Sequence, residues 1–528
     1  MASDETMKSD GSESSDQNEC ELLTLAREHF ERVAKKKVEW KDGLTDPEKE
    51  LIRKTAVGEW ADYSDKHRDK PNPKDAEKWP DSAVLRAGVI AWLCKDKKAN
   101  GEIPCDGIRI KGARVKGELE LNDALALFPL AFEQCRLMDN LVLLRAHVRT
   151  LAFDGSHVSS IRADALRVDA GLFLRNGFTA TGAVNLTGAE IGGQLNCIGA
   201  KFPQVVEGPI TALVADSARI KGSVFFRSRD CGEKTEIHRS INFENATVDD
   251  CFQWIDVECS SSAALSLQFA KVGVLWDDAK SWPSPGNLHL HGFKCDEIFE
   301  KAPTNAHQRL EWIRRQRKET PQGYIRILSG NDGNDEPYEF NPQPYEQLAM
   351  VLREQGHVDD AREILIAKEN DRDRHREISW LWRSWRFTIK HTMSYGYEPW
   401  RCTKYVLCIL ILGASLFQMG DAMGVILPTN DRAFVPSRES ATRSISPDYP
   451  DFNAFFYSLD EFVPLVNLRQ GDFWIPNFNQ DVLTGKGFGA WVCYFYALFL
   501  RVYLWVHILA GWTLTTLFVG GLTGLIRR

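Results

Sequence analysis

The chain has 528 residues, which is enough for several domains, so a single fold and a single function are not expected. With 26% charged residues and a mean hydropathy of −0.31 it is mainly water-soluble, yet a region of about 120 residues at the C-terminal end is strongly apolar. The formal net charge of −8, with no long basic stripe in the soluble part, argues against nucleic acid as a partner.

The N-terminal part is predicted to be a polar tail followed by helices. Residues 1–20 are acidic and Ser-rich and lack the basic region and apolar core of a secretory signal, so we expect a disordered cytoplasmic tail. In residues 21–102, apolar side chains recur at three- and four-residue steps, as at Leu22, Ala26 and Phe30. This spacing predicts a helical adaptor or cap that carries no catalytic constellation.

Residues 103–300 change from helical to alternating periodicity, and imperfect repeats begin with the phrase GIRIKGARVKGELEL. The repeats share a small residue, then any residue, then a large apolar one. These pairs are Ala113/Val115, Ala146/Val148, Ala189/Ile191, Ala200/Phe202, Ala218/Ile220, Ala246/Val248 and Ala270/Val272. In a narrow coil a large side chain fills the axis only beside a small one, and glycine permits the corners. We therefore expect a parallel β-helix of pentapeptide-like repeats.

A β-sandwich of short strands is the alternative for this region. It would show hairpin dipeptides between the runs, and Asn176-Gly177 and Asp154-Gly155 are the only good candidates. Residues 301–340 are loop-like and predict a linker. Residues 341–403 predict a helical hairpin around Gly356, followed by a basic juxtamembrane segment.

Two apolar stretches in the membrane domain, residues 404–528, predict membrane-spanning helices at about 404–427 and 504–526. Arginine and lysine are frequent before the first stretch, and two arginines follow the second. The positive-inside rule then places both termini in the cytoplasm and the connecting loop on the other side of the bilayer. We expect a multi-pass membrane protein.

The connecting loop contains a further apolar segment, residues 452–468, which is too short to cross and includes Asp460 and Glu461. Its aromatic residues favour the headgroup zone, so an interfacial or re-entrant helix is one interpretation. The other is a pore helix whose two carboxylates line an ion path, although no TVGYG-like filter is present. In the last span, Gly520 and Gly524 form a GxxxG pair that permits close helix–helix packing, although small residues are also ordinary there.

Several phrases together carry a family resemblance from about Trp79 to the end. They are WPDSAVLRAGVIAWL, GIRIKGARVKGELEL, GAEIGGQLNCIGAKF, PQPYEQLAMVLREQGH, YGYEPWR, SLDEFVPLVNL and GWTLTTLFVGGLTGLIRR. The chain resembles a group of bacterial membrane proteins with pentapeptide-like repeats, whose members often carry the label membrane-associated oxidoreductase. The resemblance implies a location in the bacterial inner (cytoplasmic) membrane and a redox activity.

The residues themselves show no recognisable catalytic or cofactor motif. The soluble part has no GxGxxG phrase after a strand, no P-loop and no GxSxG, and the twelve cysteines are scattered without iron–sulfur or zinc spacing. His289 and His291 alternate on a predicted strand and could share a metal, but surface histidines without such a role are more common. We therefore expect no catalytic residue, no cofactor and no metal site.

These observations favour a membrane-anchored interaction or scaffold protein that presents its β-helix to an unknown protein partner, as a rigid repeat surface can. One alternative is a two-span ion channel or pore-forming effector with 452–468 as pore segment, and another is the oxidoreductase implied by the resemblance. A DNA-mimicking coil is disfavoured because its acidic excess is weak. The expected partners are the lipid bilayer, the protein partner and further copies of this chain joined through the membrane helices.

Overall fold

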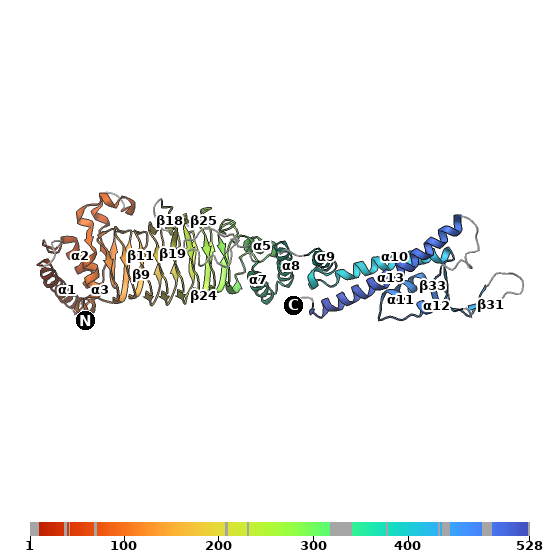
Figure 1. Ribbon diagram of the computed structural model, residues 1–528. Helices are drawn as coiled ribbons and strands as arrows, with labels where there is room; N and C mark the ends of the chain where they lie inside the picture. Colours follow the sequence, from red (N-terminus) through yellow and green to blue (C-terminus); the bar gives the residue numbers. More distant parts are fainter. Residues whose placement is uncertain are drawn as a thin grey trace, which may run out of the picture. The chain divides into compact units, whose positions relative to one another are not determined.

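A computed structural model describes residues 10–35, 40–41, 43–67, 71–205, 210–229, 232–316, 340–375, 379–430, 433–435, 444–477 and 488–525. The chain divides into two compact units, Met1–His375 and Arg376–Arg528, and each is described by itself. Parallel strands dominate the first unit and helices dominate the second (Figure 1).

Three large sheets of parallel strands run through the first unit. The first sheet contains β1 (Ala61–Asp62), β3 (Ile108–Lys111), β6 (Leu125–Glu133), β9 (His147–Ala152), β12 (Arg167–Val168), β13 (Leu172–Phe173), β16 (Glu190–Ile191), β17 (Leu195–Asn196), β20 (Arg219–Ile220), β21 (Val224–Arg227), β24 (Thr247–Ile255), β27 (Lys271–Asp277) and β29 (Lys294–Ile298). The second contains β2 (Val84–Arg86), β4 (Arg114–Lys116), β7 (Arg136–Leu137), β10 (His157–Val158), β14 (Thr179–Ala180), β18 (Lys201–Phe202), β22 (Thr235–Ile237) and β25 (Val257–Cys259). The third contains β5 (Leu119–Glu120), β8 (Leu141–Val142), β11 (Ile161–Arg162), β15 (Val184–Asn185), β19 (Thr211–Val214), β23 (Ser240–Asn242), β26 (Leu265–Ser266) and β28 (Leu288–His289).

The chain visits these sheets in a repeated order, so each turn lays its strands beside those of the turn before it (Figure 1). We call this stack, residues 108–298, the coil. Equivalent residues of successive turns pair in register, as His157 does with Arg136 on one side and Thr179 on the other. The large parallel sheets confirm the parallel-strand prediction for this region, and the paired strands of the second and third sheets are all parallel rather than hairpin partners.

Small-then-large pairs fill the interior of the coil, as the sequence predicts. Both members of each pair are buried, and Ala189 and Ile191 are 0% and 1% exposed. A column of phenylalanines stacks along the axis with ring centroids 5.3–6.3 Å apart: Phe132, Phe153, Phe178 and Phe202. One corner of successive turns has left-handed backbone, at Asp123, Arg145, Ala165, Gly188, Ser217, Asn245, Phe269 and Gly292.

Helices close the N-terminal end of the coil. They are α1 (Asp10–Ala34), α2 (Asp46–Ala56), α3 (Ala87–Lys95) and α4 (Lys97–Gly101), with the 3-10 helices η2 (Ser64–Lys66), η3 (Pro73–Lys78) and η4 (Asp81–Ala83). Helix α1 begins inside the segment predicted as a tail, where acidic residues suit a helix N-terminus, and residues 1–9 lie outside the described part. The predicted helical cap also supplies β1 and β2, which extend two sheets of the coil.

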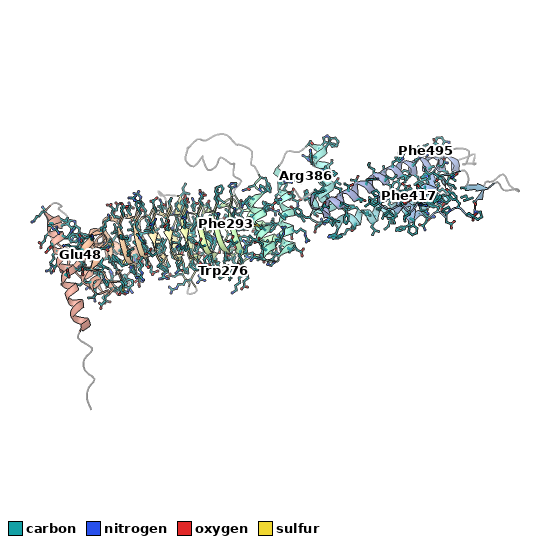
Figure 2. The ribbon with its side chains drawn as sticks, turned by 90° about the horizontal axis from the view of Figure 1, so that it is seen from below. Glu48, Trp276, Phe293, Arg386, Phe417 and Phe495 are labelled. Atoms are coloured by element: carbon teal, nitrogen blue, oxygen red, sulfur yellow. The ribbon has the colours of Figure 1, made fainter. Side chains whose placement is uncertain are left out.

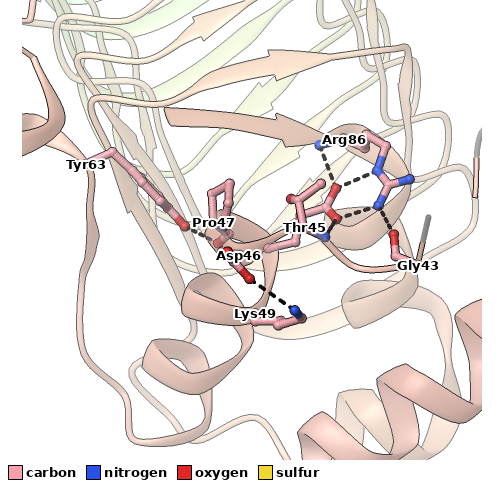
Figure 3. Close-up of polar contacts among 8 residues, drawn as sticks. Gly43, Thr45, Asp46, Pro47, Lys49, Tyr63 and Arg86 are labelled. Atoms are coloured by element: carbon pink, nitrogen blue, oxygen red, sulfur yellow. Dashed lines mark hydrogen bonds and ion pairs between the residues drawn. The ribbon is translucent and has the colours of Figure 1, made fainter. Parts of the chain in front are cut away.

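A buried ion pair fixes this cap (Figure 3). Glu48 on α2 is 0% exposed and accepts hydrogen bonds from Nε of Arg86 at 2.7 Å and from the Thr45 amide at 2.8 Å. Nη2 of Arg86 donates to the Gly43 carbonyl at 2.7 Å, and the guanidinium lies 3.8 Å from the Trp40 ring centre. Because Arg86 belongs to β2, this network joins the cap to the second sheet.

A second buried ion pair lies at the other end of the coil, where α5 (Ala306–Arg314) follows the last strands. Arg309 on α5 is 0% exposed and donates two hydrogen bonds, of 2.7 and 2.8 Å, to the carboxylate of Asp277. Trp282 donates its indole N–H to the same carboxylate at 2.7 Å. The bidentate pair therefore ties α5 to the end of β27.

A helical hairpin, α7 (Gln343–Glu354) and α8 (Val358–His375), turns at Gly356 with φ of +88°, as the sequence predicts. Three glutamines, two on α7 and one just after it, donate side-chain hydrogen bonds to backbone carbonyls at the last strand, β29. The donor–acceptor pairs are Gln343 to Phe293, Gln347 to Cys295 and Gln355 to Ile298. These bonds occupy an edge that otherwise offers unpaired carbonyls to other strands.

The second unit is built on helices α9 (Trp380–Met393), η5 (Ser394–Gly396), α10 (Arg401–Ala422), α11 (Ala454–Phe462), α12 (Gln470–Phe473) and α13 (Phe488–Leu522). Two short antiparallel pairs accompany them: β30 (Ile426–Pro428) with β33 (Trp474–Pro476), and β31 (Phe434–Val435) with β32 (Ser444–Ile445). Residues 401–422 and 491–522 form two helices long and apolar enough to cross a membrane. The second begins well before residue 504, because the aromatic stretch from Trp491 continues the helix.

Candidate functional site

A pocket of about 370 Å³ lies on the outer face of the second sheet, between that face and η3. Its lining comprises Pro73, Lys74, Ala76, Glu77, Arg136, Met138, His157, Thr179, Thr181, Lys201, Pro203 and Glu236. The pocket thus combines basic, hydroxyl and apolar groups from the cap and from five successive turns. We call it the face pocket.

The face pocket is built on a ladder of outward-pointing side chains, one from each turn. Along each strand they alternate with the side chains buried inside the coil. In β4, β7, β10, β14 and β18 the first residue points outward and the second points inward, whereas in β22 the outward residue is the second one, Glu236. The outward positions pair from turn to turn in the order Arg114, Arg136, His157, Thr179, Lys201 and Glu236. Parallel neighbours lie about 4.8 Å apart, so adjacent rungs of this ladder can contact one ligand.

Segment η3 forms the opposite wall because several contacts hold it against the coil. Nη1 of Arg114 donates to the Glu77 carbonyl at 3.1 Å, and Ala76 is 2% exposed. The side chain of Asn72 accepts a hydrogen bond from the Lys74 amide at 3.1 Å, which begins the 3-10 turn. Lys74 remains exposed at the rim, where it faces the ladder across the pocket.

The electrostatics of the face pocket are dominated by cations. Burial lowers the pKa of His157 to about 4, and the charges of Arg136, Lys74 and Lys201 act in the same direction. Burial also lowers the pKa of the Arg136 guanidinium, opposed by the charge of Glu77. His157 is therefore a neutral imidazole at neutral pH, 7% exposed and surrounded by positive charge.

The sequence prediction missed the face pocket, although a signal for it existed. The middle residue of each small–any–large phrase in the second sheet points outward, and these middle residues include Arg114, Arg136, His157 and Lys201. A search for basic residues at that one position finds the ladder. It does not find η3, because nothing in the local sequence places residues 73–78 over turns that come much later in the chain.

The two predicted pore carboxylates lie at the end of α11. Asp460 accepts hydrogen bonds from the amides of Leu468 at 2.5 Å and Gly471 at 2.9 Å, so its carboxylate holds the loop that leads to α12. Glu461 is half-buried beside it, and burial, with the charges of Asp460 and Asp472, raises the pKa of Glu461 above its ordinary value. A role in an ion path stays a prediction for both residues.

A polar centre that the sequence reasoning did not single out lies between α10, α11 and α13. His507 is 1% exposed, its Nε2 donates to the Ser458 carbonyl at 3.0 Å, and its Nδ1 accepts from the Tyr503 hydroxyl at 3.2 Å. The Ser458 hydroxyl donates to the Leu410 carbonyl at 3.2 Å. These bonds join the short helix to both long ones, where Phe417 is fully buried beside them (Figure 2).

Glycines allow this close approach. A Cβ at Gly413 would lie 2.5 Å from Oγ of Ser458, and a Cβ at Gly511 would lie 1.8 Å from the Phe462 carbonyl oxygen. The predicted packing glycine Gly524 instead lies after the end of α13 with φ of +74°, and a Cβ there would meet no atom within 4 Å. Gly520 lies within α13, so packing of this pair against another copy of the chain stays a prediction.

Local contacts or burial hold the side chains of His289, His291 and Cys135 within the described part of the chain. No group of three or more His, Cys, Asp or Glu side chains gathers there in a way that could hold a metal ion. His289 and His291 contact Gln268 and Asn341 through their ring nitrogens. Burial raises the pKa of the Cys135 thiol to about 12, which keeps it protonated and unreactive.

Comparison of the chain with known protein families, with curated proteins and with solved structures yields no match. The fold and the face pocket therefore carry the functional argument without help from relatives.

Proposed function

We propose that the chain is a membrane-anchored interaction protein whose coil, a pentapeptide-like parallel β-helix, presents the second-sheet face to a protein partner. The observation that carries this proposal is the face pocket with its in-register ladder, because a rigid repeat that holds side chains in a fixed row suits recognition. The turn-by-turn pairing and the buried small-then-large pairs support the pentapeptide-like assignment.

The anchor in this proposal is the pair of apolar helices α10 and α13. Helix α13 has 35 residues and is about 52 Å long, so it exceeds a hydrocarbon core of about 30 Å and extends into the interface or tilts. Its exposed aromatic residues, such as Trp491 and Phe495, suit the headgroup zone (Figure 2). The basic flanks support cytoplasmic termini, and the bacterial inner membrane remains the proposed location.

A partner-capture experiment tests the proposal on the full-length protein in detergent extracts of its own membranes. The variant Thr181→Trp places a bulky group on the second-sheet face, and Arg162→Trp places the same group on the third sheet of an adjacent turn. We expect quantitative mass spectrometry to find proteins that co-purify with the wild type and with Arg162→Trp but not with Thr181→Trp. Equal recovery by all three proteins, or no specific recovery, would contradict the proposal. A flavin or haem absorption band in the purified protein would instead favour the redox activity.

A two-span ion channel is the second candidate, and one observation favours it. Three carboxylates, Asp460, Glu461 and Asp472, gather at the end of α11. Ion flux into liposomes containing the purified protein tests it, with Glu461→Gln compared against Asp451→Asn, an exposed acid that precedes the same helix. A channel would conduct as wild type and with Asp451→Asn but lose most of its flux with Glu461→Gln, whereas absence of flux in every sample would eliminate it.

A further inference from the structure

The basic side chains and the imidazole of the face pocket differ in whether they have a hydrogen-bonding or ion-pair partner. Lys201 pairs with Glu236 at 2.7 Å, but the side chains of Arg136, Lys74 and His157 form no hydrogen bond or ion pair within the described part of the chain. Arg136 lies on the ladder beside His157, and Lys74 lies on the opposite wall. The unpaired donors therefore converge on one half of the pocket.

Keeping these donors unpaired has an energetic cost. A half-buried guanidinium loses part of its hydration, and an anion that accepts its hydrogen bonds offsets this loss. Arginine presents two parallel N–H donors that match the oxygens of a carboxylate or phosphate. His157 strengthens the case, because a 93% buried imidazole without a partner is directed into the same space, where it can share a proton with an anion.

The rest of the lining indicates an organic ligand rather than a bare ion. Met138, Pro203, Pro73 and Ala76 provide apolar surface, and Thr179 and Thr181 provide hydroxyl groups. A volume of about 370 Å³ falls at the lower end of the range for small-molecule sites. Two carboxylates, Glu77 and Glu236, also line the pocket. Glu236 pairs with Lys201, and the charge of Glu77 acts on Arg136 without forming a hydrogen bond or ion pair with it in the described part of the chain.

We propose that the face pocket binds a small organic oxyanion, with its phosphate or carboxylate group held between Arg136 and Lys74 and its apolar part against Met138 and Pro203. This proposal rests on the proposed role of the coil as a recognition surface. The oxyanion can belong to a free small molecule or to a side chain of the protein partner, and both sources present the same group to the pocket.

Calorimetric titration of the full-length protein in detergent tests the proposal, with phosphoserine and glutarate as probes and sodium chloride at equal ionic strength as reference. Lys74→Gln removes a charge from an exposed side chain, so we expect the fold to stay intact. Arg136→Gln removes the central donor, and Arg162→Gln removes the same residue type from the neighbouring sheet. We expect saturable binding of at least one probe, weakened roughly tenfold or more by Lys74→Gln and Arg136→Gln and unchanged by Arg162→Gln.

A second readout follows the His157 imidazole by NMR. Its charged neighbours are Arg136, Lys74 and Lys201, and Glu77 and Glu236 also line the pocket, so a bound anion raises the pKa of His157 from about 4. A rise on addition of the bound probe supports the proposal. The absence of saturable binding by both probes, or equal binding by the wild type and Lys74→Gln, overturns it.

The outcomes separate this proposal from the proposed function. If Thr181→Trp abolishes partner capture but neither probe binds, the pocket proposal fails and the interaction function stands. If phosphoserine or glutarate both binds the pocket and displaces the captured partner, the oxyanion comes from the partner. If a probe binds but no partner depends on the second-sheet face, the pocket proposal stands and the proposed function fails.

Discussion

The corners of the coil have left-handed backbone, a conformation that favours glycine. Two neighbouring turns place different residues at this corner. Gly188 has φ of +64° with no atom within 4 Å of an added Cβ, and Ala165, one turn earlier at the same corner, has φ of +55°. A non-glycine residue in this conformation costs about 1 kcal/mol. We predict that Gly188→Ala lowers the unfolding temperature of the sheet signal in circular dichroism by a few degrees and that Ala165→Gly raises it. A change of the same sign in both variants would contradict the backbone explanation.

Burial of His157 makes the stability of the first unit depend on pH. The unfolded imidazole takes up a proton near pH 6.5, whereas the folded one does so only near pH 4. The unfolded state therefore binds more protons between these values, and stability present above pH 6.5 is lost as the pH falls towards 4. We predict that His157→Gln removes up to about 3 kcal/mol of this loss. Urea midpoints at pH 7 and pH 4.5 measure it, and an identical pH dependence in the variant and the wild type would refute the assignment.

At the scale of elements, the join between the coil and α5 depends on one buried carboxylate. Asp277→Asn would leave the Arg309 guanidinium, 0% exposed, without its counter-charge, and the expected cost is about 3–5 kcal/mol. Asp123→Asn is the matched control, because Asp123 forms an equally short bidentate pair with Arg145 on the surface. Exposed pairs contribute about 1 kcal/mol or less. Chemical unfolding should therefore separate the two variants clearly, and similar losses would show that the buried pair has no special weight.

Helix α9 has two faces that differ in chemistry. Leu381 and Trp385, four residues apart, are 62% and 42% exposed, whereas Arg383, Arg386 and Lys390 follow a second stripe by their spacing in the helix. This arrangement suits a helix that lies in the headgroup zone. We predict that a spin label at Trp385→Cys in liposomes is more accessible to oxygen than to a polar nickel reagent, and that the order is reversed at Lys390→Cys. Equal accessibility at both sites would place α9 away from the interface.

The elements themselves were predictable to different degrees. The small-then-large pairs predict parallel turns because the packing rule is local, and both Ala189 and Ile191 are buried as expected. The sequence does not predict strand β2, because Val84–Arg86 follows a helical turn. Its pairing strand, Arg114–Lys116, lies thirty residues later in the sequence. Long separations in sequence also hid the face pocket and the His507–Ser458 contact. Local patterns specify such elements, whereas contacts between remote segments decide where the sites form.

At the scale of the whole molecule, the proposed function requires the coil to lie on one side of the bilayer and the loop between α10 and α13 on the other. Cys105 is exposed in the first unit, and Asp448 is exposed in the loop. We predict that a membrane-impermeant maleimide labels Asp448→Cys in intact cells. The labelling of Cys105 is measured as the part that is lost in Cys105→Ser. We predict that this part appears only after the membrane is permeabilised. Labelling of Cys105 in intact cells would place the face pocket outside the cytoplasm and invert the orientation derived from the basic flanks, while labelling of both sites would show that the two helices do not span.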